Sequence, residues 1–148
     1  MEHHNLTSYL SSFHLIIFFI VSIVIKDSIK LKISVYVDGS GGSNGGFGFF
    51  VKETGESFYE KRSEITNNQA EYLAIISALK KFVDNDEEIT IFSDSKNTVN
   101  QLNHEFAINN EKLRDLARES WLIIGKFSSI SIVWIPRKEN LAGKMLGS

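Results

Sequence analysis

The chain has 148 residues and carries 16 Lys and Arg against 18 Asp and Glu, which gives a formal net charge of −2. This balance excludes a strongly basic coat of the kind that attracts polyanions over long range. The absence of cysteine excludes disulfide frameworks, thiolate nucleophiles and cysteine-based zinc sites. A hydrophobic content of 43% is enough for one folded domain with a short appendage.

The first 29 residues differ in composition from the rest of the chain. Residues 10–25 are almost entirely apolar, but this stretch is shorter than the about 20 residues that span a bilayer. No Lys or Arg precedes it and no small-x-small cleavage site follows it, so a secretory signal is disfavoured. Three alternatives stay open: a marginal membrane anchor, a segment that packs on a partner, or sequence upstream of the true translation start. If the segment is a membrane anchor, Lys26, Lys30 and Lys32 lie on the cytoplasmic side of the membrane. We expect the rest of the chain to be a cytoplasmic domain.

The domain predicted over residues 30–148 begins with three strands. Apolar side chains alternate in LKISVYVD, which predicts a strand over Leu31–Asp38. A region with six of the ten glycines, Gly39–Gly48, then leads into strands predicted at Phe47–Lys52 and Ser57–Arg62. The short turn between these two strands favours antiparallel pairing of all three.

Helices and strands alternate in the rest of the chain. Thr66 or Asn67 can cap the first helix, and short apolar runs predict the strands. The predicted elements are a helix at 68–83, a strand at 88–93, helices at 96–103 and 111–125, a strand at 129–135 and a helical turn at 139–146. This order predicts a mixed five-stranded α/β sheet flanked by helices, with three antiparallel strands and two parallel strands that follow right-handed crossovers.

Three acids flank these elements in a pattern that favours a metal site. Asp38 ends the first predicted strand, Asp94 follows the fourth, and Glu71 lies near the start of the helix between them. If strands one and four are parallel neighbours, both aspartates emerge at the carboxyl edge of the sheet, where ligands bind in open α/β folds. Converging carboxylates repel one another and require a divalent cation such as Mg²⁺ or Mn²⁺. The alternative is that each aspartate only forms a turn or a helix cap.

Four sequence blocks resemble the type 1 ribonucleases H of the ribonuclease H-like superfamily. They are VYVDGSG at 35–41, TNNQAEYLAIISAL at 66–79, IFSDSKNTVNQL at 91–102 and WIPRKENLAGKML at 134–146. The resemblance implies the ribonuclease H-like fold and a two-metal endonuclease that hydrolyses the RNA strand of RNA–DNA hybrids to 5′-phosphate and 3′-hydroxyl ends. It also implies that Asp38, Glu71 and Asp94 are catalytic and bind the metal, Mg²⁺ or Mn²⁺.

The fourth block departs from the family pattern. Aligning Ala142 with the alanine of the family's Asn-x-x-Ala-Asp motif, or a near variant, puts Gly143 where a fourth acid would stand. Glu139 lies four residues earlier, and on a continuous helix it would face the same side, so our hypothesis is that it replaces the missing metal ligand. The catalytic histidine of some members has no counterpart among residues 135–140. His104, the only histidine of the predicted domain, is interpreted as a surface or capping residue.

Seven residues around these acids are predicted to contact the substrate. They are Gly39, Ser40, Gly41, Asn67, Asn68, Gln69 and Lys96. Amide side chains at the start of a helix can form hydrogen bonds with the 2′-hydroxyl of RNA, and a glycine backbone allows the RNA strand to approach closely. A lysine can form an ion pair with a phosphate. Helix capping, turn formation and solvation are the alternative roles of the same residues. Two tryptophans, Trp121 and Trp134, are predicted to belong to the core rather than to stack on bases.

Charge and the missing acid keep other functions open. Leaving out Glu2, Lys26 and Asp27, the chain has 15 basic and 16 acidic residues, so we expect it to bind an RNA–DNA hybrid weakly and in a salt-sensitive way unless another domain assists. We also expect a monomer. The first alternative is a catalytically impaired module of the same fold that binds hybrids or double-stranded RNA, which Gly143 favours. The second is a DNA-directed nuclease of the same superfamily.

Overall fold

The computed structural model describes the backbone of residues 5–145 and the side chains of residues 11–25 and 29–144. The chain divides into two compact units, and the division falls between Leu31 and Lys32. The first unit contains one helix, α1 (Asn5–Ser28), and the second contains a five-stranded sheet with its helices.

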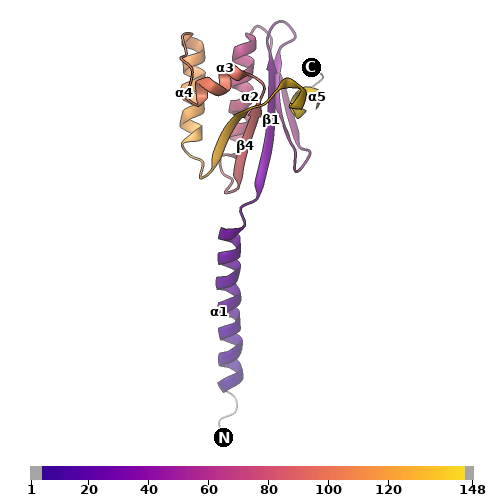
Figure 1. Cartoon of the computed structure of the whole chain (residues 1–148). Helices are drawn as coiled ribbons and strands as arrows, with labels where there is room; N and C mark the ends of the chain where they lie inside the picture. Colours follow the sequence, from indigo (N-terminus) through magenta and orange to yellow (C-terminus); the bar gives the residue numbers. More distant parts are fainter. Residues whose placement is uncertain (1–4, 146–148) are drawn as a thin grey trace. The chain divides into compact units, whose positions relative to one another are not determined.

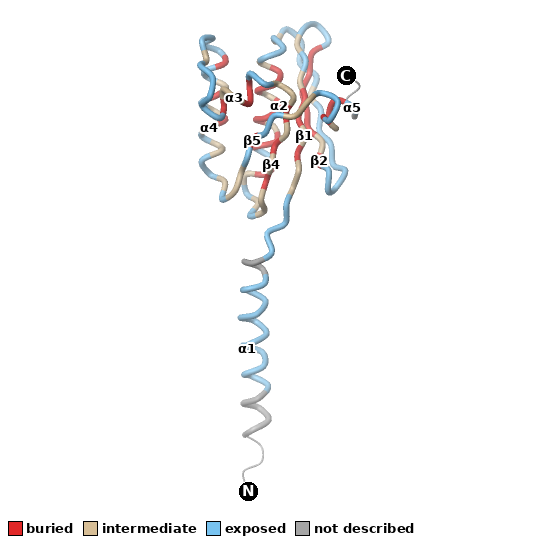
Figure 2. Tube along the Cα trace, viewed as in Figure 1, coloured by how far each residue is buried: buried red, intermediate tan, exposed pale blue. Residues whose placement is uncertain are grey.

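Helix α1 contains the apolar segment at residues 10–25. The large apolar side chains between Phe13 and Ile25 are each 44–72% exposed, and the described residues of this segment all have the colour of exposed residues in Figure 2. A helix that packs on a core has one apolar stripe, whereas α1 has apolar residues all round. Within the described residues, no helix combines the length and the apolarity that crossing a membrane requires.

The second unit is built on one sheet with the strand order β3-β2-β1-β4-β5 (Figure 1). Its strands are β1 (Lys32–Ser40), β2 (Gly46–Val51), β3 (Ser57–Lys61), β4 (Glu88–Ser93) and β5 (Ile130–Trp134). β2 is antiparallel to both β1 and β3, whereas β4 is parallel to both β1 and β5. This is the predicted mixed sheet, and β1 and β4 are parallel neighbours, as a shared acidic edge requires.

The helices of this unit are α2 (Asn67–Phe82), α3 (Lys96–Leu102), α4 (Glu111–Ile124) and α5 (Leu141–Met145), with a short 3₁₀ turn, η1 (Arg137–Glu139). They agree with the predicted helices except near the C-terminus, where the sequence predicts one helical turn at 139–146. Asn140 has a non-helical backbone, with φ −78° and ψ 105°, and separates η1 from α5. Glu139 and Gly143 are therefore not on one continuous helix, and the premise that they share a helix face is wrong.

The hydrophobic core lies between the sheet and α2. Val35 and Val37 of β1, with Ile89 and Ile91 of β4, are fully buried. They alternate along their strands because successive side chains of a strand point to opposite faces, and they pack against apolar residues of α2. The residues that flank the three acids belong to buried segments of β1, β4 and α2 (Figure 2). This burial keeps the flanking residues in fixed positions.

The two tryptophans have different surroundings. Trp121 of α4 is half-buried and packs against the core, as predicted. Trp134 is 43% exposed because it ends the edge strand β5, so the prediction that it belongs to the core is wrong. His104 is exposed, has a φ of 64° just after the C-cap of α3, and stacks on Trp121 with 4.7 Å between ring centroids. This confirms its interpretation as a surface residue.

Candidate active site

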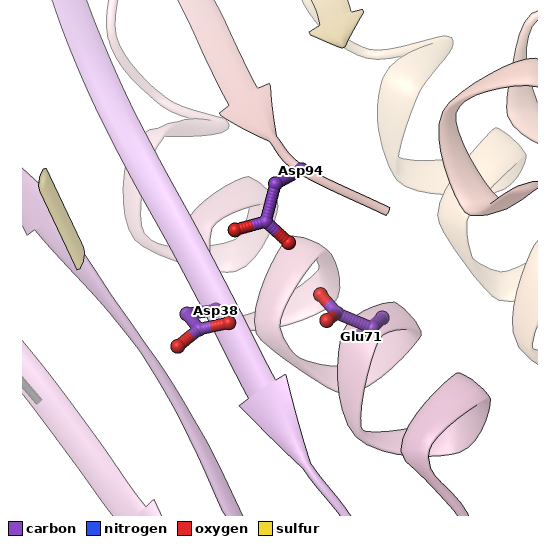
Figure 3. A group of neighbouring side chains, drawn as sticks. All are labelled: Asp38, Glu71 and Asp94. Atoms are coloured by element: carbon purple, nitrogen blue, oxygen red, sulfur yellow. The ribbon is translucent and has the colours of Figure 1, made fainter. Parts of the chain in front are cut away.

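The three predicted acids lie together at the carboxyl edge of β1 and β4 (Figure 3). Asp38 lies on β1, Asp94 directly follows β4, and Glu71 extends from the N-terminal part of α2 toward both aspartates. One carboxylate oxygen of each acid lies within 4.8 Å of those of the other two. Parallel pairing of β1 with β4 accounts for this arrangement, because it brings the carboxyl ends of both strands to one edge.

Two glycines of the β1 region allow α2 to approach closely enough for Glu71 to join the aspartates. A Cβ atom on Gly39 would lie 2.4 Å from the backbone carbonyl carbon of Ala70, and one on Gly41 would lie 2.4 Å from the carbonyl oxygen of Ile65. Such distances exclude a side chain at either position unless the backbone shifts. Close packing is therefore a structural reason for two of the glycines that the sequence predicts as substrate contacts.

Glu71 has the strongest electrostatic perturbation in this cluster. Its side chain is buried, and its Oε2 atom has no hydrogen-bond partner among the described residues. Burial, followed by the charges of Asp38 and Asp94, raises the pKa of Glu71 to about 9 against the opposing effect of Arg137. A buried carboxyl group in these surroundings needs either a proton or a cation. The partnerless oxygen and the all-carboxylate donor set fit a hard divalent cation such as Mg²⁺ or Mn²⁺.

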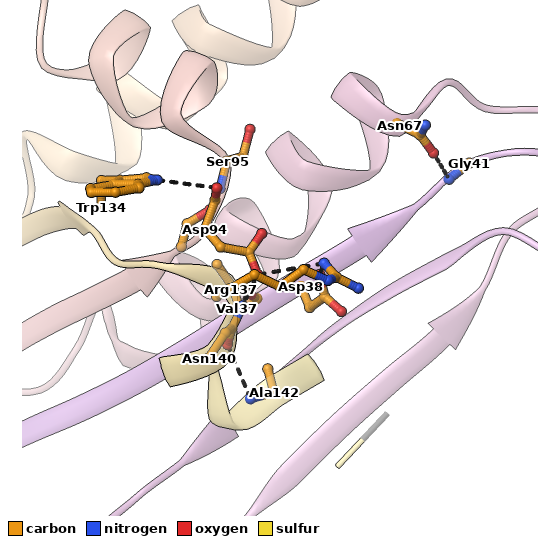
Figure 4. Close-up of polar contacts among 11 residues, drawn as sticks. Val37, Asp38, Gly41, Asn67, Asp94, Ser95, Trp134, Arg137, Asn140 and Ala142 are labelled. Atoms are coloured by element: carbon orange, nitrogen blue, oxygen red, sulfur yellow. Dashed lines mark hydrogen bonds and ion pairs between the residues drawn. The ribbon is translucent and has the colours of Figure 1, made fainter. Parts of the chain in front are cut away.

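Arg137 of η1 reaches the two aspartates from the segment after β5 (Figure 4). Its Nη1 atom lies 3.8 Å from Asp38 Oδ1 and 3.6 Å from Asp94 Oδ2. The arginine side chain is 63% exposed, whereas the two aspartate side chains are 6% and 8% exposed. The sequence prediction missed this residue; the available signal was a basic residue shortly after the last strand.

Asn140 is a second residue that the sequence prediction missed. Its side chain is fully buried, and its Nδ2 atom donates to the backbone oxygen of Val37 and to Asp94 Oδ2, both at 2.9 Å. Its Oδ1 atom accepts from the Ala142 amide at 3.1 Å (Figure 4). Asn140 therefore ties the start of α5 to β1 and orients the Asp94 carboxylate.

Neither residue discussed for the fourth acid position brings a carboxylate to the cluster. Gly143 is buried in α5, and Glu139 is exposed at the end of η1. Among the residues that the structure describes, the acids grouped within 4.8 Å are Asp38, Glu71 and Asp94, without Glu139. The site therefore has three carboxylates and one guanidinium.

The amide residues at the start of α2 are partly used within the protein. Thr66 is the N-cap: its Oγ1 accepts from the Gln69 amide at 3.1 Å, and Gln69 Oε1 accepts from the Thr66 amide at 2.9 Å. Asn67 Oδ1 accepts from the Gly41 amide at 2.7 Å (Figure 4). These contacts give Gln69 and Asn67 structural roles, whereas Asn68 is exposed and stays a predicted substrate contact.

Lys96 and Trp134 lie beside Asp94. The Lys96 Nζ atom is 5.7 Å from the ring centroid of Trp134, and Trp134 Nε1 donates to the backbone oxygen of Asp94 at 3.2 Å. Lys96 and Ser40 are both exposed. Lys96 therefore stays a predicted phosphate contact, and Trp134 supports the loop that carries Asp94.

Comparison with known proteins gives matches over most of the chain. The sequence profile of the reverse transcriptase-like family matches residues 44–147. The protein named "Putative hydrolase EbsB" of Enterococcus faecalis is 29% identical over 120 residues, which cover 76% of this chain and 88% of that protein.

Solved structures of ribonucleases H share the fold. Ribonuclease H1 of the halophilic archaeon Halobacterium salinarum superposes with a TM-score of 0.70 at 27% identity, over 78% of this chain and 94% of that one. LC11 ribonuclease H1, solved in complex with an RNA/DNA hybrid, superposes with a TM-score of 0.68 at 24% identity, over 77% of this chain and 92% of that one. The fold and the relatives together support a nuclease of the ribonuclease H type. The chain therefore belongs to the reverse transcriptase-like family and is a type 1 member of the ribonuclease H-like superfamily.

Proposed function

We propose that this protein is a divalent-metal-dependent endonuclease that hydrolyses the RNA strand of RNA–DNA hybrids. The observation that carries the proposal is the convergence of Asp38, Glu71 and Asp94 within 4.8 Å, with the Glu71 Oε2 atom buried and without a partner among the described residues. A cluster with this donor set suits a cation that also contacts phosphate oxygens. The hybrid held by LC11 ribonuclease H1 supports an RNA–DNA hybrid as the substrate.

Asp38, Glu71 and Asp94 would hold the metal. Two divalent cations, Mg²⁺ or Mn²⁺, would supply the Lewis acidity for in-line displacement at a phosphodiester, with 5′-phosphate and 3′-hydroxyl products. The protein's own contribution is to hold the three carboxylates in fixed positions. Asn140 does so for Asp94 through its 2.9 Å hydrogen bond, and the close approach of α2 to β1 does so for Glu71.

Groups around the acids can bind and orient the nucleic acid. Lys96 is an exposed cation next to Asp94, and we assign it to contact with a phosphate. Asn68 is an exposed amide at the start of α2, the position that we assign to contact with a 2′-hydroxyl, which distinguishes RNA from DNA. Gly39, Ser40, Gly41, Asn67 and Gln69 complete the proposed substrate surface.

The test is cleavage of a labelled RNA–DNA hybrid, with RNA duplex, DNA duplex and single strands as controls, in Mg²⁺, Mn²⁺ or EDTA. We expect cutting of the RNA strand of the hybrid alone, and none in EDTA. Asp94→Asn should reduce the rate by at least about two orders of magnitude because it removes a metal ligand. Asp86→Asn, which changes an exposed aspartate in the turn before β4, is the matched control and should cleave at the wild-type rate.

Gly143 favours a second candidate, a hybrid- or duplex-RNA-binding module without turnover, because it leaves the site with three acids. Retained hybrid binding without cleavage in any cation would support that module and exclude the proposed activity. Cleavage of the DNA duplex instead would identify a DNA-directed nuclease.

A further inference from the structure

We call the part of the acidic cluster that faces Arg137 its outer side, and the part at Glu71 its inner side. Glu71 forms the inner side, where its Oε2 atom has no partner among the described residues. Asp38 and Asp94 form the outer side, where the guanidinium of Arg137 lies 3.8 and 3.6 Å from their carboxylate oxygens (Figure 4). A cation of the protein itself therefore lies at the outer side, whereas no ion pair to Glu71 is found among the described residues.

The contacts of Arg137 are loose enough to be exchanged. Its distances to the two carboxylates exceed the 2.7–3.2 Å that is typical of N–H···O hydrogen bonds, so they are ion pairs without direct hydrogen bonds. The arginine side chain is 63% exposed and can move into solvent without disturbing the core. Asp38 and Asp94 are 6% and 8% exposed and stay in place, so their charges attract whichever cation is available.

The charges of the cluster match a single divalent cation. Three ionised carboxylates opposite one guanidinium leave two negative charges, which one Mg²⁺ or Mn²⁺ ion neutralises. A second divalent cation would make the cluster net positive in the absence of substrate phosphates. Gly143, buried in α5, offers no carboxylate to compensate for it.

We propose that, until substrate phosphates are bound, Arg137 takes the place of the second divalent cation, so that the substrate-free protein binds one divalent cation and the guanidinium occupies the outer side of the site. The inference deepens the proposed function and rests on its metal site, but not on the identity of its substrate. Arg137 is a positioning residue of this site: it sets the number of bound cations and lowers their affinity by competing for Asp38 and Asp94.

The experiment is a titration of metal-free full-length protein with Mn²⁺, followed by isothermal calorimetry and by electron paramagnetic resonance of the free ion. We expect one Mn²⁺ per wild-type chain. Arg137→Gln should bind a second Mn²⁺ and should bind the first with a dissociation constant at least about tenfold lower, since a competing charge is gone. Lys138→Gln removes the same charge from the neighbouring exposed residue and should behave like the wild type.

Two results would overturn the inference. One is a wild-type stoichiometry of two Mn²⁺ ions with unchanged affinity in Arg137→Gln. The other is the absence of bound Mn²⁺ in wild type and Arg137→Gln alike, which would remove the metal site itself. Thermal unfolding of both variants in EDTA establishes that they are folded. One bound Mn²⁺ with the expected effect of Arg137→Gln, in a protein that cuts no hybrid, would support this inference while excluding the proposed hydrolysis.

Discussion

The buried carboxyl group of Glu71 must be either protonated or bound to a cation. Burial and the neighbouring aspartates raise the pKa of this carboxyl group from 4.5 to about 9 in the metal-free protein. The unfolded chain loses the proton near the lower value, so between the two values the folded state holds the additional proton. The free energy of unfolding therefore falls as the pH rises from about 4.5 to about 9, and it is independent of this group outside that window.

Glu71→Gln should remove that dependence, because glutamine is neutral in both states. In EDTA at pH 8 we expect the variant to be more stable than the wild type by at least about 1 kcal/mol. The reason is that the wild-type carboxyl group is protonated in the folded state at this pH and ionises when the chain unfolds, which favours the unfolded state of the wild type. Urea unfolding at pH 5 and pH 8 measures the effect. Glu105→Gln, which changes an exposed carboxylate in the loop after α3, is the control. Parallel stability profiles for the wild type and Glu71→Gln would contradict the raised pKa.

The contact between β1 and α2 determines whether the acids on these two elements form one site. Asp38 and Glu71 are 33 positions apart in the sequence. They meet because the backbone at Gly39 lies directly against the backbone at Ala70, at the start of α2. The capping box of Thr66 and Gln69 fixes where the helix starts, and the Asn67 side chain holds the Gly41 amide. The geometry of the acidic cluster therefore depends on packing between these two elements as well as on the acids.

Gly39→Ala tests this contact. The new Cβ atom would lie 2.4 and 2.5 Å from the carbonyl carbon and oxygen of Ala70, and because both are backbone atoms, α2 must move. We expect a loss of about 1–3 kcal/mol in the free energy of unfolding and weaker Mn²⁺ binding, as Glu71 leaves the aspartates. Gly125→Ala is the control, since its Cβ atom would be 3.5 Å from the nearest atom, an ordinary contact. Wild-type Mn²⁺ affinity in Gly39→Ala would show that the site does not depend on this approach.

The chain contains two units that differ in how far their apolar side chains are buried. The hydrophobic core uses strands and helices of the unit that begins at Lys32, whereas α1 exposes apolar side chains on all sides. The predicted boundary at residues 29 and 30 falls just before the division at Leu31 and Lys32. The sheet unit thus has the buried apolar surface that an independently folding domain requires.

Deletion of residues 1–29 should leave a domain that unfolds cooperatively, with the Mn²⁺ stoichiometry of the full chain. The reason is that the deletion removes no residue of the core cluster or of the acidic site. Thermal unfolding by circular dichroism and a Mn²⁺ titration of the shortened protein measure both properties. A broad, non-cooperative transition would show instead that the N-terminal segment contributes to the fold.

The elements of the sheet domain and the three acids can be predicted from the sequence, because each rests on a local pattern. Alternation along Leu31–Asp38 and the apolar run before Asp94 predict strands from residues that are adjacent in the chain. Acids placed directly at the ends of those strands are visible in the same short windows. Local patterns failed at residues 139–146, where the non-helical Asn140 divides the expected helical turn and leaves Glu139 outside the acidic cluster.

The groups that surround the acids come from distant parts of the chain and are not predictable from local patterns. Asn140 bonds to Val37 and to Asp94 across 103 and 46 positions of the sequence, and Arg137 approaches Asp38 and Asp94 from the same distant segment. The partnerless oxygen of Glu71 likewise depends on how α2 packs against β1. Such contacts are set by the path of the backbone in space, and no periodicity within a strand or a helix records them. For this reason the three acids can be predicted from the sequence, whereas the charge and the hydrogen bonds around them depend on packing.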